Sequence, residues 1–198
     1  MRILLLVGLI GFIMTSCQNG GGSTTLDVAI EGVPEGAVLT PYDDIPDLVR
    51  ATVDVGGDIT LEGDLLSGLK HGSWTEFELQ GPIKKVTTYY MGVKHGVELT
   101  FDRTGYVTEK LNWANGVLDG EAKVYERRKV MEEKTYVDGD LHGVVKKYYR
   151  TGKVMEEAPY QNGKMHGIAK WFDSEGNVSL AYRYENGELV DKNVDVDR

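Results

Sequence analysis

A repeat of about 24 residues is the feature that most constrains the fold of this chain. The first glycine of each unit is followed by a similar segment, and these glycines lie 24, 24, 23, 24 and 24 residues apart: Gly68, Gly92, Gly116, Gly139, Gly163 and Gly187. All four histidines of the 198-residue chain lie in pentapeptides of the form Gly-x-x-His-Gly: His71, His95, His142 and His166. A fixed period of this length is typical of repeat architectures, in which each unit packs mainly on its neighbours.

Two turn signals within each unit predict a β-hairpin. Four units begin at Asn-Gly or Asp-Gly, as in Asn115-Gly116, which favours a type I′ turn because both central residues need a positive φ. The second signal, "DRTG", "YRTG" or "DSEG", fits a type I turn followed by a left-handed glycine. The segments between the turns are rich in Val, Thr, Tyr and Phe, which is strand composition. The sequence therefore predicts an all-β fold: an antiparallel β-hairpin repeat array in a single sheet, with about five to six units of 23–24 residues.

Two columns of the repeat pair aromatic residues with glycines. The aromatic column lies three residues before the first glycine of a unit: Tyr89, Trp113, Tyr136, Tyr160 and Tyr184. The second glycine of each unit forms the other column: Gly72, Gly96, Gly120, Gly143 and Gly167. A strand glycine leaves a gap that a ring from a neighbouring strand can cover. We therefore expect Tyr89 to lie over Gly96 and Trp113 to lie over Gly120.

The pattern of Asn-Gly, His-Gly, an aromatic residue and a later Gly-x-Val, repeated from Leu65 to Asp191, resembles the bacterial variant of the MORN repeat (membrane occupation and recognition nexus). This resemblance implies a β-hairpin solenoid that contacts proteins or lipids, and it does not imply an enzyme. Proteins similar to this are commonly named as antitoxin-like or immunity-like components, or as envelope proteins of unknown role.

The ends of the array depart from the repeat. Ile59–Leu66 matches only a second strand, which predicts that the array (residues 59–191) begins with a half unit, and "GELVD" at its end lacks the His and the second glycine. Both ends are interpreted as caps, and residues 192–198 as a tail. Residues 26–58 form an acidic segment without repeats. Within it, "LDVAIEG" and "AVLTPYD" alternate enough for two strands, and "DDIPDLVRA" is either a helical turn or a loop.

The first residues carry an export signal. Arg2 is followed by an apolar run, Ile3–Met14, that is too short to span a bilayer, and "MTSC" then resembles the lipobox of bacterial lipoproteins. We predict a lipoprotein signal peptide at residues 1–16, lipidation of Cys17 by acyl chains such as palmitate, and a flexible tether at residues 17–25. The alternative is an ordinary signal peptide with a chance cysteine. Gln18 is not Asp, which favours the outer membrane under the enterobacterial sorting rule.

Charge and motifs disfavour several kinds of function. The formal net charge is −9 and no basic block occurs, so nucleic-acid binding lacks its electrostatic signature. In-register histidines two strands apart are roughly 9–10 Å from one another, too far for all four to hold one metal ion. Each histidine is interpreted as a ring that packs near a turn and donates one hydrogen bond, with a metal site or a pH switch as the alternative. We expect no cofactor and no metal.

Paired acids recur in register at Glu132-Glu133 and Glu156-Glu157. Successive strand residues point to opposite faces, so the sheet separates the members of each pair. We therefore expect these acids to pair with lysines across strands, with Lys146, Lys147 or Lys170, and we expect no enzyme activity.

Aromatic residues beyond the repeat columns are the candidate binding surface: Trp74, Tyr90, Trp171 and Tyr182. Exposed Tyr and Trp among charged neighbours suit contact with a protein or a glycan. The alternative is that these rings only cover the sheet. The sequence thus favours a lipid-anchored envelope protein, an adaptor or an antitoxin-like protein, that binds a protein partner. The second hypothesis is a glycan or cell-wall binder that uses an aromatic ladder.

Overall fold

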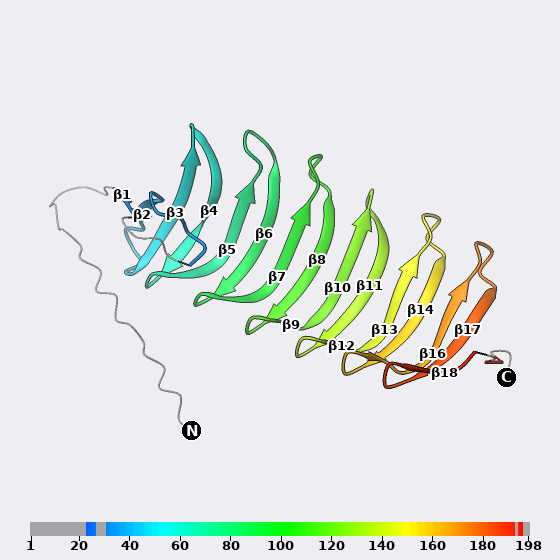
Figure 1. The fold of residues 1–198 in the computed structure, drawn as a ribbon. Coiled ribbons are helices and arrows are strands. Elements are labelled where there is room, and N and C mark those ends of the chain that lie inside the picture. Colours follow the sequence, from blue (N-terminus) through cyan, green and yellow to red (C-terminus); the bar gives the residue numbers. More distant parts are fainter. Residues whose placement is uncertain (1–22, 27–30, 193, 196–198) are drawn as a thin grey trace, which may run out of the picture.

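The computed structural model describes residues 23–26, 31–192 and 194–195. These residues form one open antiparallel sheet of 18 strands and contain no helix (Figure 1). The hairpins lie side by side in chain order, from β3 and β4 at one end to β17 and β18 at the other, and each strand is bowed (Figure 1). The predicted all-β hairpin array is therefore confirmed.

Each strand pairs with its neighbours in the chain, and in three units one strand is interrupted and carries two labels. The strands are β1 (Thr24–Thr25), β2 (Val38–Pro41), β3 (Leu48–Val55), β4 (Asp58–Leu66), β5 (Leu69–Phe77), β6 (Ile83–Tyr90), β7 (Val93–Phe101), β8 (Val107–Ala114), β9 (Val117–Leu118), β10 (Gly120–Glu126), β11 (Lys129–Val137), β12 (Asp140–Leu141), β13 (Gly143–Tyr148), β14 (Val154–Gln161), β15 (Lys164–Met165), β16 (Gly167–Phe172), β17 (Val178–Glu185) and β18 (Glu188–Asp191).

The turns at one edge of the sheet adopt the conformation that the Asn-Gly signal predicts. Asn115 and Gly116 have φ values of 50° and 84°, and the turns that begin at Asp138, Asn162 and Asn186 match them. Met91, in an equivalent turn, and Arg127, in a turn at the opposite edge, also have positive φ, although neither residue type favours it. Arg127-Arg128 forms a two-residue turn in place of the longer glycine turn, which explains the single interval of 23 residues.

Some of the turns at the other edge are held by an aspartate. In the "DRTG" turn the Asp102 side chain accepts hydrogen bonds from the backbone N–H groups of Thr104 and Tyr106, and Gly105 has a φ of 84°. Asp173 holds the "DSEG" turn in the same way. The strand register shifts next to each of these turns, as expected for a type I turn followed by a left-handed glycine.

The second glycine of each unit has a different role from the one predicted. All five members of this column have a positive φ, between 68° and 116°, and lie where the strand register shifts or the strand is interrupted. A Cβ built at Gly96 would lie nearest Thr88, and one at Gly120 would meet Asn112. The prediction that Tyr89 lies over Gly96 and Trp113 over Gly120 is therefore wrong. Glycine is needed here because the β-bulge requires a left-handed backbone.

The array begins earlier than predicted. β3 and β4 form a complete hairpin across Gly56 and Gly57, so the sheet does not start with a half unit at Ile59. The segment "DDIPDLVRA" supplies the start of β3 and contains no helical turn. The strand expected in "AVLTPYD" is confirmed as β2, whereas "LDVAIEG" lies largely outside the described residues. Thr24 and Thr25, assigned to the tether, pair with β2, and Cys17 lies outside the described residues.

The hydrophobic core lies at the N-terminal end of the sheet. Its buried members come from the N-terminal segment and from the first strands: Leu26, Val33, Ala37, Leu39, Ala51, Leu65 and Trp74. Residues 31–37 thus cover the first hairpins, while the later hairpins form a single layer (Figure 1). This segment is therefore a cap on the open end of a repeat array, as such arrays require.

The two faces of the single layer differ. Direct pairing places Trp74, Thr87 and Glu98 on one face, and the same face carries the buried small residues of the later hairpins: Ala122, Val145, Ala158 and Ala169. We call it the Trp74 face. The opposite face, which carries Tyr90, is called the Tyr90 face.

Candidate binding surfaces

Trp74 is not available to a partner, so its assignment to an exposed surface is wrong. Its side chain is only 2% exposed, and its indole N–H donates a hydrogen bond of 3.0 Å to the Asp64 carbonyl oxygen. A Cβ at Gly63 would overlap the indole ring. The arrangement of a ring over a strand glycine thus occurs here, between Trp74 and Gly63, and it belongs to the core.

The other three candidates lie on both faces of the sheet. Tyr90 is 63% exposed and lies on the Tyr90 face between two imidazoles, with ring centroids 5.6 Å from His71 and 6.2 Å from His95. Trp171 and Tyr182 lie on the Trp74 face near the far end of the array, half-buried and in edge contact at 5.6 Å. The four residues therefore do not form one surface.

An exposed apolar stripe runs along the Tyr90 face beside three successive Asn-Gly-type turns. Its members are Leu69, Tyr90, Val93, Val97 and Val117, each more than a third exposed. Tyr90 pairs directly with Val93, Leu69 lies 3.5 Å from the Cβ position of Gly92, and Val93 lies 3.3 Å from that of Gly116. Only Tyr90 was identified from the sequence. The signal for Leu69, Val93 and Val117 was the residue after the first glycine, which is aliphatic in three units and charged in the next three; Val97 instead follows a second glycine.

The aromatic column forms a row on the Trp74 face. Tyr89, Trp113, Tyr136, Tyr160 and Tyr184 are all half-buried, and each lies opposite the second glycine of its own hairpin, as Tyr89 does with Gly72. Neighbouring members are two strands apart, or roughly 9–10 Å at the usual strand spacing. The row therefore presents partly exposed rings at regular intervals along the sheet.

The histidines lie on separate hairpins, and two of them form hydrogen bonds to the backbone of neighbouring turns. The Nδ1 atoms of His95 and His166 accept hydrogen bonds of 3.4 Å from the backbone N–H groups of Asn115 and Asn186. The rings thus pack near turns as interpreted, but these two accept a hydrogen bond where donation was expected. Within the part of the chain that the structure describes, no group of three or more His, Cys, Asp or Glu side chains could hold a metal ion.

The recurring glutamate pairs are split between the faces, as predicted. Glu132 pairs across strands with Lys147 and Glu133 with Lys146. The glutamates of both pairs also form ion pairs with lysines of neighbouring strands: Lys123–Glu133 at 3.1 Å, Lys147–Glu156 at 3.0 Å and Lys146–Glu157 at 3.4 Å. The Tyr148 hydroxyl donates to Glu133 at 2.6 Å, and burial together with this bond raises the pKa of Tyr148 to about 12. These charges pair across and along the strands of the single layer.

A buried carboxylate, Glu98, links β6 and β7 on the Trp74 face. Glu98 is 4% exposed, and its carboxylate accepts hydrogen bonds from the Lys94 ammonium at 2.6 Å and from the Thr87 hydroxyl at 2.9 Å. The Lys94 ammonium also lies 4.3 Å from the centre of the Trp113 ring. The buried charge of Glu98 therefore has two partners, which makes its burial tolerable, while Lys94 is half-buried.

The fold and these surfaces define the class of the protein: a β-hairpin repeat protein with two accessible faces. A family profile described as a MORN repeat variant matches residues 141–162, which cover one hairpin from β12 to the turn after β14. The match supports a MORN-type repeat protein and hence a repeat-based binding protein. No curated protein matches the chain. No helix in the described ranges is long and apolar enough to cross a membrane.

Proposed function

We propose that this chain is a lipid-anchored protein of the cell envelope that binds a protein partner through the apolar stripe. The exposure of the stripe carries the proposal. Contiguous exposed apolar side chains on a soluble surface mark interaction sites, and an exposed Tyr is a frequent anchor in protein interfaces.

The part of the stripe beside the turns is confined to three units, which supports a specific contact there. Leu69, Val93 and Val117 follow the first glycine in three successive units, whereas Asp140, Lys164 and Glu188 hold the equivalent positions further along. Exposed Val137 and Val144 continue the Tyr90 face on the next hairpins, where Val137 pairs with Asp140, the first of those charged positions. The partner is therefore expected to contact the hairpins β4–β9 and to leave the later turns in water.

The anchor is proposed from the sequence alone, since Cys17 lies outside the described residues. The "MTSC" segment favours lipidation, and Gln18 favours the outer membrane. An adaptor role and an antitoxin-like, immunity-like role both fit a tethered binding surface. We propose binding rather than catalysis, because the acids that recur in register are divided between the two faces.

The protein contact is tested by cross-linking in the envelope of the native host. A photo-reactive residue at Val93 of the full chain is expected to cross-link to a discrete protein, and one at Lys164, the equivalent position in a later turn, is not. Changing Tyr90→Ser in the Val93 probe should remove the cross-linked product. The proposal is contradicted if both probes give the same products, or if the Val93 probe gives none.

The anchor is tested separately by fatty-acid labelling. The full chain is expected to incorporate a palmitate analogue and to sediment with membranes, and Cys17→Ala is expected to lose both properties. If Cys17→Ala keeps the label, the anchor lies elsewhere.

The aromatic row favours glycan binding as a second candidate. Regularly spaced, half-exposed rings suit contact with sugar rings. Retention of the full chain on isolated peptidoglycan, lost in Tyr136→Leu/Tyr160→Leu and kept in Tyr90→Ser, would favour this candidate. The opposite pattern, with binding lost only in Tyr90→Ser, would exclude it.

A further inference from the structure

Lys70 carries a buried charge for which the described residues supply no counter-ion. Its side chain is 9% exposed, and its ammonium lies 4.3 Å from the Trp74 ring centre and 5.0 Å from that of Tyr89. A Cβ at Gly32 would lie 2.8 Å from the same nitrogen, so the cap lies directly against the Lys70 ammonium. Among the described residues no carboxylate lies within ion-pair distance of it. Burial lowers the pKa of Lys70, against the attraction of Glu76 and Glu31.

The next unit contains the carboxylate partner that Lys70 lacks among the described residues. Lys94 holds the equivalent position one repeat later, and its ammonium has both a ring, Trp113, and a carboxylate, Glu98, four residues further along. Four residues after Lys70 the chain has Trp74 in place of a glutamate. The first unit therefore keeps the lysine and the rings of this arrangement but lacks its carboxylate.

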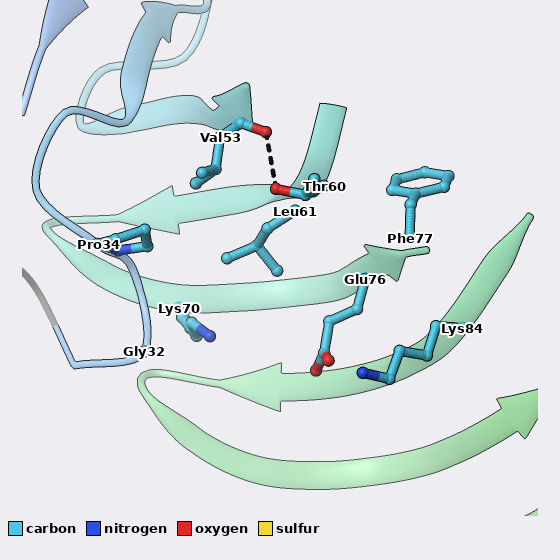
Figure 2. A pocket seen from close by; sticks show the side chains of 9 residues that line it. All are labelled: Gly32, Pro34, Val53, Thr60, Leu61, Lys70, Glu76, Phe77 and Lys84. Carbon is cyan, nitrogen blue, oxygen red and sulfur yellow. Dashed lines mark hydrogen bonds between the residues drawn. The ribbon is translucent and has the colours of Figure 1, made fainter. Parts of the chain in front are cut away.

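A cavity of about 350 Å³, widely open to solvent, adjoins Lys70 at this point. Figure 2 shows the charged ends of Lys70, Glu76 and Lys84 directed into the same space, which lies between the cap and strands β3–β6. Val53, Leu61 and Pro34 form its apolar side. The volume is in the range of small-molecule sites, which are typically about 300–1,000 Å³.

We propose that this cavity binds a small carboxylic acid, whose carboxylate contacts Lys70 as Glu98 contacts Lys94 and whose short apolar chain packs against Val53 and Leu61. Lys70 and Lys84 attract a carboxylate, while Glu76 in the cavity and Glu31 nearby oppose a second negative charge, which favours a monoanion over a dianion. The apolar side favours an acid with a hydrocarbon chain over an inorganic anion. Val33, 1% exposed, anchors the cap that covers the site.

The test is a titration of the full chain with hexanoate, followed by calorimetry and by amide chemical shifts. Hexanoate is expected to bind, and its neutral analogue hexanamide and inorganic phosphate are expected to bind at least about tenfold more weakly, as loss of a charge-assisted hydrogen bond predicts. Lys70→Met is expected to lose at least about tenfold in affinity for hexanoate, and Lys84→Met about threefold. Lys164→Met, the same change on a distant turn, should leave the affinity unchanged.

A variant that is expected to bind hexanoate more tightly separates the proposal from a loss of binding caused by misfolding. Glu76→Gln removes the competing carboxylate and is expected to strengthen hexanoate binding about threefold. Equal hexanoate affinity in the wild type and a folded Lys70→Met, equal binding of hexanamide, or tighter binding of phosphate would each overturn the proposal. So would the absence of any hexanoate binding by the wild type.

Discussion

At the scale of single residues, glycine serves two separate needs in each unit. The first glycine completes a type I′ turn, and the second, directly after the His position, allows the strand to bulge. At Gly120 the φ is 93°, and an added Cβ would meet only Asn112, at an ordinary contact distance of 3.6 Å. The requirement there is therefore set by the backbone and not by space.

Gly120→Ala is expected to lower the free energy of unfolding by about 1–2 kcal/mol, the typical cost of holding an L-residue in the left-handed region. Urea unfolding followed by circular dichroism measures it. Gly120→Asn should cost less, because Asn tolerates this region better. An equal loss for Ala and Asn would instead indicate a steric cause.

Met91→Asn is expected to raise the free energy of unfolding by about 0.5–1 kcal/mol, because Asn is favoured at the positive φ of 48° that Met91 adopts. Asn115→Met, the reverse change in the next unit, should cause a similar loss. Urea midpoints of both variants at an unchanged m-value provide the measurement. Changes of the same sign in both variants would contradict the explanation.

At the scale of the hairpin, the buried Glu98 carboxylate on β7 is bonded to Thr87 on β6 and to Lys94 on its own strand. Burial raises the pKa of Glu98, but the hydrogen bonds from Lys94 and Thr87 together leave it below its ordinary value. A carboxyl group whose pKa is lowered by folding stabilises the protein above its unfolded pKa. That contribution is lost as the pH falls through the folded pKa.

Glu98→Gln is therefore expected to lower the free energy of unfolding by about 2 kcal/mol near pH 7, because a charged hydrogen bond is lost. The difference from the wild type should shrink as the pH falls through the folded pKa of Glu98, because the group then becomes protonated in the folded state as well. Urea unfolding over a series of pH values from neutral to acid measures it. A difference that does not change with pH would show that the charge of Glu98 has no part in it.

The hairpins also show what the sequence could and could not predict. Asn115-Gly116 and "DRTG" specify their turns through local backbone preference, so the strands and turns from Ile59 onward followed directly. The hairpin β3–β4 was missed because no His-Gly pentapeptide precedes its Gly56-Gly57 turn, although Gly57 precedes Gly81 by one period of 24 residues. Trp74 looked exposed because its burial depends on a cap without any repeat pattern.

At the scale of the whole molecule, stability is divided between a packed end and a single layer. The cap and first hairpins supply the one cluster of buried hydrophobic residues among the described parts, whereas the later hairpins depend on cross-strand pairs such as Lys147–Glu156. Arrays of this kind gain stability from each interface between neighbouring units.

Deleting residues 140–163, one complete unit of the single layer, is expected to leave a folded sheet. The denaturant m-value should fall roughly in proportion to the surface removed. Deleting residues 31–37, which cover the first hairpins, should instead destabilise the protein strongly, because Trp74 and Leu65 lose their cover. Circular dichroism and urea unfolding compare the two. Loss of the sheet after removal of the internal unit alone would contradict a modular array.

Because every strand pairs only with those next to it in the chain, the molecule can be built in the direction of synthesis. Each hairpin that leaves the ribosome or a translocation pore meets an edge that has already formed, and none has to wait for a distant segment to close the fold. The cap, which is made first, can provide the starting edge for this growth.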